Sequence, residues 1–206
     1  MNRREFLQCA TLLISGVGAT RMGWALSEEQ QVYLATAPNF TDREIDYFTP
    51  AQRELVAAIA ETIIPRTDTP GAIDANVPRY IEIMVEQWLN DDERAIFNTG
   101  LSQLQEQTQQ ELGSPFIQLD AQARTKILEG LEAQASDSPW YDLGNVRRDF
   151  ISDAPFICQV KELTVWGFFT SEVGGTEVLR SNIVPMRFDG DIPLKPDDSS
   201  WSGRGI

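Results

Sequence analysis

The sequence predicts an all-α protein, an irregular helical bundle of about five main helices followed by an extended, proline-rich C-terminal tail. Apolar residues recur at spacings of three and four, which is the pattern of an amphipathic helix with one buried face. No segment shows the sustained two-residue alternation of a strand, and the breaks fall between segments of helical length. These observations favour helices packed on helices.

The first core helix is expected to begin directly after Thr49. That residue can cap the helix, Pro50 fits its first position, and Gln52 can complete a capping box. The expected buried stripe consists of Leu55, Val56, Ile59, Ala60, Ile63 and Ile64. Pro65 lacks an N–H and disfavours a helical residue before it, so the helix should end at Ile64.

The second helix is expected after a turn that contains Pro70 and Gly71. Asn76 is a favourable N-cap residue, and Pro78 would lie in the first turn, where its missing N–H carries no penalty. The predicted apolar stripe consists of Tyr80, Ile81, Met84, Val85 and Trp88. The chain therefore makes a rigid break between two helices.

Three more helices follow in the prediction. The third begins at the acidic residues 91–93, which suit the positive end of a helix dipole, and continues to Leu112, before Gly113. Asp120 is expected to cap the fourth. The inward-facing residues of the fourth helix are Ile127, Leu128 and Leu131. The fifth helix covers residues 154–169. Its expected inner side consists of Phe156, Val160, Leu163, Trp166 and Gly167.

Residues 1–25 are predicted to be a twin-arginine (Tat) signal peptide. The motif consists of Arg3, Arg4, Phe6 and Leu7. An apolar run over residues 9–19 follows, shorter than the roughly 20 apolar residues of a spanning helix. Cleavage is expected after Ala25, with Ala37 as the alternative, and the other interpretation of the segment is an amphipathic first helix. The leader predicts a periplasmic protein that the Tat translocase exports.

The rest of the chain is divided into two parts. Residues 26–48 are predicted to be an irregular arm, and residues 49–206 a single helical domain whose extended tail begins at about residue 183. The tail is rich in proline, which favours an extended chain over a helix.

The composition excludes several classes of function. A net charge of −14 repels phosphate backbones, so nucleic acid is not expected as a partner. The chain has no histidine, which removes the usual general base and the commonest metal ligand. Cys158 is interpreted as a buried structural thiol, with a bond to a partner chain as the alternative.

No cofactor site is predicted in this chain. The sequence has no glycine-rich dinucleotide fingerprint, no Cys-x-x-Cys-His haem motif and no four-cysteine cluster. We therefore expect no catalytic, cofactor-binding or metal-binding residues. A Tat signal on a chain without a cofactor site suggests an escort for another protein that has one.

Two segments are predicted to form a surface for a partner. The first is the break between the first two helices, in which Arg66 and Asp68 are the ionisable residues, so it is interpreted as a shaped surface without reactive groups. Its candidate interface residues are Pro65, Arg66, Thr67, Asp68, Pro70 and Gly71. The second lies at the end of the fifth helix. Its candidates are Trp166, Phe168, Phe169, Thr170, Ser171, Glu172 and Gly174. Core packing and partner docking both remain open for this segment.

The same two segments carry a resemblance. Residues 60–72, Ala-Glu-Thr-Ile-Ile-Pro-Arg-Thr-Asp-Thr-Pro-Gly-Ala, resemble the characteristic motif of the gluconate 2-dehydrogenase subunit 3 family. Residues 166–175 are similar to a Gly-Tyr-Phe-Thr-Ser-Glu-x-Gly string in that family. The resemblance covers residues 48–188, with both motifs in the expected order behind a Tat leader.

The resemblance implies a small, non-catalytic subunit of a bacterial flavoprotein dehydrogenase of the glucose-methanol-choline (GMC) type. Such a subunit would bind, stabilise and escort the leaderless large subunit through the Tat system. FAD is expected in the large subunit, and the complex can include a cytochrome c subunit and associate with the membrane.

Two alternatives remain at this point. One is a free-standing periplasmic binding or structural protein. The other is a periplasmic enzyme that uses carboxylates alone, in the manner of a glycosidase pair. The carboxylates considered for such a pair are Asp68, Asp74, Glu82 and Glu172.

Overall fold

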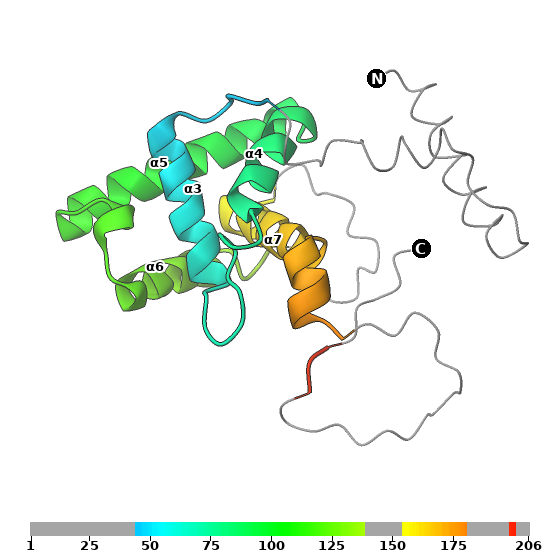
Figure 1. Cartoon of the computed structure of the whole chain (residues 1–206). Coiled ribbons are helices and arrows are strands. Elements are labelled where there is room, and N and C mark those ends of the chain that lie inside the picture. Colours follow the sequence, from blue (N-terminus) through cyan, green and yellow to red (C-terminus); the bar gives the residue numbers. More distant parts are fainter. Residues whose placement is uncertain (1–43, 139–153, 181–197, 201–206) are drawn as a thin grey trace, which may run out of the picture. The chain divides into compact units, whose positions relative to one another are not determined.

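The computed structural model describes residues 44–138, 154–180 and 198–200, and within them every regular element is helical (Figure 1). The elements are α3 (Pro50–Ile63), α4 (Val77–Gln87), α5 (Asp91–Leu112), the 3₁₀ helix η2 (Phe116–Gln118), α6 (Ala121–Gln134), α7 (Phe156–Phe169) and the π-helix η4 (Gly174–Val178). The predicted all-α class is confirmed. The predicted signal peptide, most of the predicted arm and most of the predicted tail lie outside the described residues.

Helix ends follow the predicted capping chemistry at three places. The Thr49 hydroxyl accepts from the Gln52 N–H, and the Gln52 side chain accepts from the Thr49 N–H, which completes the capping box of α3. Asp120 accepts from the Ala123 N–H at 2.8 Å and caps α6. Gly113 ends α5 with a φ of 68°, a left-handed conformation that glycine adopts without strain.

The start of α4 differs from the prediction. Asn76 occupies the N-cap position but its side chain makes no capping hydrogen bond, and its backbone is left-handed, with a φ of 55°. The backbone supplies the cap instead, because the Val77 N–H donates to the Ala72 carbonyl at 3.0 Å. A tight turn out of the preceding loop requires the left-handed residue, and asparagine tolerates that conformation better than most.

The predicted apolar stripe of α4 was also wrong at its end. Trp88 is 70 % exposed, whereas Ile81, Ile83 and Val85 are buried. Trp88 is the C-cap residue, so its side chain leaves the helix where the chain turns toward α5. A stripe extrapolated at constant period does not account for this turn.

α7 packs on every other described α-helix. It contacts α3, α4, α5 and α6, and it carries more buried apolar residues than any of them. Phe97 of α5 stacks on Phe48 and meets Phe156 of α7 edge-to-face, with ring centroids 6.1 and 5.4 Å apart. Cys158 has no exposed surface, as expected for a buried thiol.

A close contact fixes α4 against α7. The ring of Tyr80, in the first turn of α4, lies so near Gly167 that a Cβ atom there would be 2.6 Å from Tyr80 Cδ1. Burial, together with the charge of Glu162, raises the pKa of the Tyr80 phenol. The N-terminal turn of α4 therefore meets the C-terminal turn of α7 without space for a side chain at Gly167.

Residues 198–200 lie against the end of η4. The Arg180 N–H donates to the Ser200 carbonyl at 2.9 Å, and the Arg180 side chain donates to the Ser199 carbonyl and pairs with Asp198. The described helices include none that is both long and apolar enough to cross a membrane.

A buried carboxylate joins the first described residues to two helices. Glu82 of α4 is 1 % exposed and accepts from the backbone N–H groups of Tyr47 and Phe48 at 3.0 and 2.9 Å. Its oxygens also accept from Arg53 of α3 and from Arg79 one turn earlier in α4. Burial alone would raise the pKa of this carboxyl, but the hydrogen bonds from Arg53, Phe48 and Arg79 outweigh burial and lower it.

We predict that Glu82→Gln destabilises the fold by about 2–3 kcal/mol. The change removes the charge that balances two guanidinium groups, and these groups are partly exposed, so the loss is smaller than for a fully buried pair. Urea unfolding would measure it. Glu86→Gln, one turn further along α4, is the control and should stay within about 0.5 kcal/mol of the wild type.

The effect of Glu82→Gln should depend on pH. Because the native pKa of Glu82 lies below its ordinary value of 4.5, its contribution is fully present above pH 4.5 and is lost as the pH falls through the native pKa. Wild type and variant should therefore converge in stability in acid. A difference that is constant down to the acid transition would contradict this role of the ionised carboxylate.

Candidate partner-binding surface

The loop between α3 and α4 is held by a carboxylate at its base. Glu61, in the last turn of α3, accepts from the Arg66 N–H through Oε1 and from the Ile73 N–H through Oε2, both at 2.9 Å. The Ala72 N–H donates to the Ile64 carbonyl at 2.9 Å and closes the loop beside them. Two of these hydrogen bonds, from Ile73 and Ala72, join the two ends of the loop, and the third holds Arg66 to the end of α3.

A second carboxylate, Asp74, holds the loop from its other side. Its oxygens accept from the Arg66 side chain through two nitrogens, Nε at 2.7 Å and Nη2, and from the Gly71 N–H at 2.8 Å. Arg66 is two-thirds exposed yet is fixed by this bidentate pair. Sequence reasoning missed both Glu61 and Asp74 as loop supports.

Gly71 is required by the loop's own packing. A Cβ atom at this position would lie 2.4 Å from Glu61 Oε1 and 2.6 Å from the Arg66 nitrogen. Gly71 is buried, and Pro70 is half-buried. The longest exposed stretch of the loop consists of Pro65, Arg66, Thr67, Asp68 and Thr69, and Ile73 and Asn76 are exposed separately, nearer to α4. The predicted shaped surface is therefore this five-residue tip, with Gly71 beneath it.

The end of α7 divides the second set of candidates into two groups. Phe168 is 2 % exposed, and Gly167 faces Tyr80, so both belong to the core. Trp166 is 57 % exposed and Phe169 is 42 % exposed, together with Val165 of the same turn. The prediction that Trp166 shares one side of the helix with Val160, Leu163 and Gly167 was wrong. Gly167 occupies the side of the helix that meets α4, and this leaves the indole outside.

Side chains after α7 fix the direction of the chain. The Thr170 hydroxyl donates to the Trp166 carbonyl and the Ser171 hydroxyl to the Phe168 carbonyl, both at 2.6 Å. The Ser171 oxygen also accepts from the Gly174 N–H at 2.9 Å. A Cβ atom on Gly174 would lie 2.1 Å from the Phe168 carbonyl oxygen, so only glycine fits. Ser171 and Gly174 thus end the helix, whereas Thr170 and Glu172 are exposed.

The two candidate segments are connected to the same pair of packed helices, α4 and α7. The loop leads directly into the first turn of α4, and the exposed aromatic residues lie on the last turn of α7. These two turns meet where Tyr80 packs on Gly167. We call Val165, Trp166 and Phe169 the aromatic turn, and we call residues 65–69 the loop tip.

Two of the four carboxylates considered for catalysis have structural roles. Asp74 is paired with Arg66, and Glu82 is buried under two arginines. Asp68 and Glu172 are exposed. Within the described residues, no group of three or more acidic, cysteine or histidine side chains could hold a metal ion.

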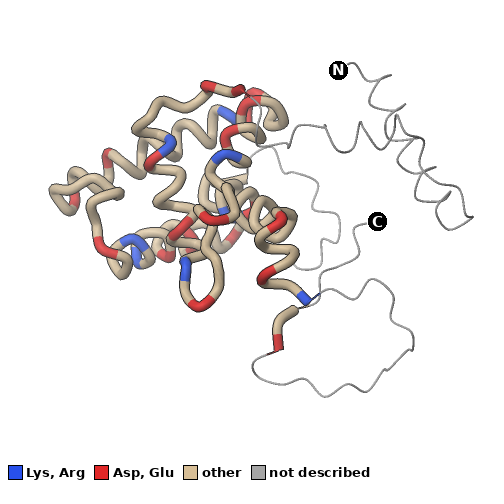
Figure 2. Tube along the Cα trace, in the orientation of Figure 1, with Lys and Arg blue, Asp and Glu red and all other residues tan. Residues whose placement is uncertain are grey.

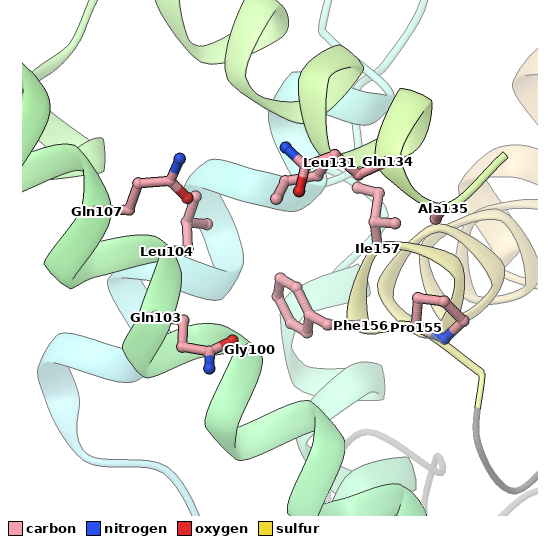
Figure 3. A pocket seen from close by; sticks show the side chains of 10 residues that line it. All are labelled: Gly100, Gln103, Leu104, Gln107, Leu131, Gln134, Ala135, Pro155, Phe156 and Ile157. Carbon is pink, nitrogen blue, oxygen red and sulfur yellow. The ribbon is translucent and has the colours of Figure 1, made fainter.

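A cleft of about 260 Å³ lies between α5, α6 and the start of α7 (Figure 3). Gln103 and Gln107 of α5 face Leu131 and Gln134 of α6 across it, and Phe156 forms part of its wall. None of its ten lining residues is ionisable. The cleft offers amide groups and apolar surface but no acid, base or nucleophile.

Comparison with known proteins gave one family. The model of the family described as gluconate 2-dehydrogenase subunit 3 matches residues 50–190, which include both candidate segments. No match was found among curated proteins or among solved structures.

We predict that Gly71→Ala opens the loop and destabilises the protein by about 1–3 kcal/mol. The new Cβ would displace the Glu61 carboxylate from the N–H groups of Arg66 and Ile73. Thermal unfolding would measure the loss. Limited trypsin digestion should show faster cleavage after Arg66, because the loop tip is then free to enter the protease.

Gly130→Ala on α6 is the matched control. A Cβ at this helical position meets nothing within 4 Å, so the variant should be as stable as the wild type or slightly more stable. Unchanged stability and unchanged cleavage in Gly71→Ala would show that Glu61 does not hold the loop.

Proposed function

Because the chain belongs to the gluconate 2-dehydrogenase subunit 3 family, we propose that it is a small, non-catalytic subunit that binds, stabilises and co-exports a flavoprotein dehydrogenase. Membership itself implies a subunit of that dehydrogenase complex that works with the other subunits. What we propose beyond membership is the role of this subunit within the complex. In this proposal the large subunit is of the GMC type, binds FAD and oxidises a sugar, sugar acid or alcohol.

The aromatic turn is the observation that carries the proposal. Three large apolar side chains, each between 42 % and 57 % exposed, lie within one turn of α7. An exposed cluster of this kind in a soluble domain is typical of a surface that a partner covers. Phe169 packs edge-to-face on the buried Phe168, with centroids 5.2 Å apart, so its ring is already oriented.

The loop tip supports docking in a different way. Glu61 and Asp74 hold the backbone at Arg66, Gly71 and Ile73, on both sides of the tip, before any partner binds. A preformed surface loses little conformational entropy on association, which favours affinity. In this proposal the large subunit meets the loop tip and the aromatic turn as two preformed features of the same domain.

The role in export rests on the leader motif Arg3-Arg4 with Phe6 and Leu7. In this proposal the Tat translocase carries the folded complex into the periplasm, and the leader on this chain serves the catalytic subunit as well. A cytochrome c subunit would then complete the complex at the membrane. A free-standing periplasmic protein is the alternative, and it would keep the aromatic turn exposed.

We predict that Trp166→Ala combined with Phe169→Ala weakens the complex roughly 30-fold or more. Both side chains are largely exposed in this chain, although Phe169 also contacts the buried Phe168, and the large subunit would bury both. The measurement is recovery of flavoprotein with the tagged full-length chain, followed by its FAD absorbance. Trp88→Ala, which removes an even more exposed indole from α4, is the control and should leave recovery unchanged. Full recovery with the double variant would exclude the aromatic turn as the interface.

We predict that Arg3→Lys combined with Arg4→Lys retains both this chain and its flavoprotein in the cytoplasm. Fractionation of cells, with antibodies to both subunits, would measure this. Arg21→Lys, the same substitution beyond the apolar run, is the control and should not affect export. If the large subunit still reaches the periplasm when the pair is changed, the escort role is refuted even where the complex forms.

A further inference from the structure

The negative charge of the protein lies beyond residue 43. Residues 1–43 contain four basic and four acidic residues, so the whole net charge of −14 lies in residues 44–206. Every described α-helix contains at least one acidic residue, and basic residues are far fewer in the described part of the chain (Figure 2). Part of this charge is therefore available to outside partners.

Nearly all described arginine and lysine side chains form ion pairs or hydrogen bonds with other groups of this chain. Arg53, Arg66, Arg79, Lys161 and Arg180 form ion pairs with carboxylates of the chain. Arg94 and Arg124 donate mainly to backbone carbonyls. Among the described residues Lys126 alone has no such contact. The surface thus presents carboxylates with few free cations beside them.

The imbalance extends to the proposed interface. Glu172 and Glu177 follow the aromatic turn, and Asp68 lies in the loop tip. All three are exposed, and in the described part of the chain none of them forms an ion pair. The neighbouring cations Arg66, Lys161 and Arg180 are already paired with Asp74, Glu132 and Asp198.

The end of α7 adds to the negative potential. The carbonyl end of a helix carries about half a negative charge, and basic residues in the last turn usually balance it. α7 has no basic residue in its last turn. Hydroxyls of Thr170 and Ser171 donate to two of the terminal carbonyls, but they bring no positive charge. Phe169, the last residue of the helix, therefore lies at its negative end.

We propose that the catalytic subunit covers this surface with an apolar hollow rimmed by arginine and lysine side chains. This inference rests on the proposed function and names the chemistry of the partner's side. A neutral apolar partner would bury the aromatic turn while removing water from nearby unpaired carboxylates, which is unfavourable. A basic rim balances these carboxylates, and an arginine can also stack on the exposed indole of Trp166.

Association kinetics in a salt series would test the inference. The probes are the tagged full-length chain and the FAD-containing catalytic subunit from the same host, in NaCl from about 50 mM to about 500 mM. For the wild type, the association rate should fall roughly tenfold across the series because screening removes the steering field. Glu172→Lys combined with Glu177→Lys should lower the association rate by a similar factor at low salt and flatten its salt dependence.

Two further variants make the test specific. Glu106→Lys with Glu129→Lys changes the net charge equally at exposed sites on α5 and α6, and it should keep most of the wild-type rate and its salt slope. Glu172→Gln with Glu177→Gln removes charge with little change in shape and should give an intermediate rate. Equal melting temperatures for all variants would show that the fold is retained.

The outcomes distinguish the two levels of the proposal. If wild-type binding is independent of salt and both lysine variants bind alike, while Trp166→Ala with Phe169→Ala still loses the partner, the basic rim is refuted and the docking surface stands. If the wild-type chain binds no flavoprotein at any salt concentration, the proposed function and the basic rim are both overturned. Selective loss of association in the Glu172 and Glu177 variants supports both.

Discussion

The position of α4 depends on one buried carboxylate. Glu82 gathers two backbone N–H groups from residues 47–48, one guanidinium from α3 and one from its own helix. These hydrogen bonds join residues 47–48 to α3 and α4. Because Glu82 is buried, water cannot replace any partner that is lost. Since the first turn of α4 carries the Tyr80 ring that meets α7, the arrangement of the loop tip and the aromatic turn follows from this anchor.

Acidic side chains have two separate uses in this protein. The first use is structural: Glu61, Asp74 and Glu82 accept hydrogen bonds from backbone N–H groups that lie outside the helices. Such groups have no partner within a helix, so the carboxylates supply one. Glu172 and Glu177 stay in water and contribute to an external field. A count of acidic residues in the sequence cannot separate these groups, because the difference arises from which backbone N–H groups lie within reach.

Local chemistry made much of the fold predictable from sequence. The capping box at Thr49 and the stop at Pro65 involve only neighbouring residues, so the start and end of α3 could be placed. Which face of a helix is covered depends on distant elements, and there the predictions for Trp88 and Trp166 were wrong. Glu82 was missed as an anchor, because most of its partners, the backbone of residues 47–48 and Arg53, are distant in the sequence. That the loop forms a surface for a partner stays a prediction, and its supports, Glu61 and Asp74, required the contacts of the folded chain.

The contact between Arg180 and residues 198–200 has an entropic consequence. It joins positions about twenty residues apart, and closing a segment of this length costs on the order of 3 kcal/mol of chain entropy. Its hydrogen bonds and ion pair, partly exposed to water, return a similar amount. The contact between Arg180 and residues 198–200 is therefore close to neutral in free energy. A few kcal/mol of binding energy from a partner would decide whether this contact is kept or lost.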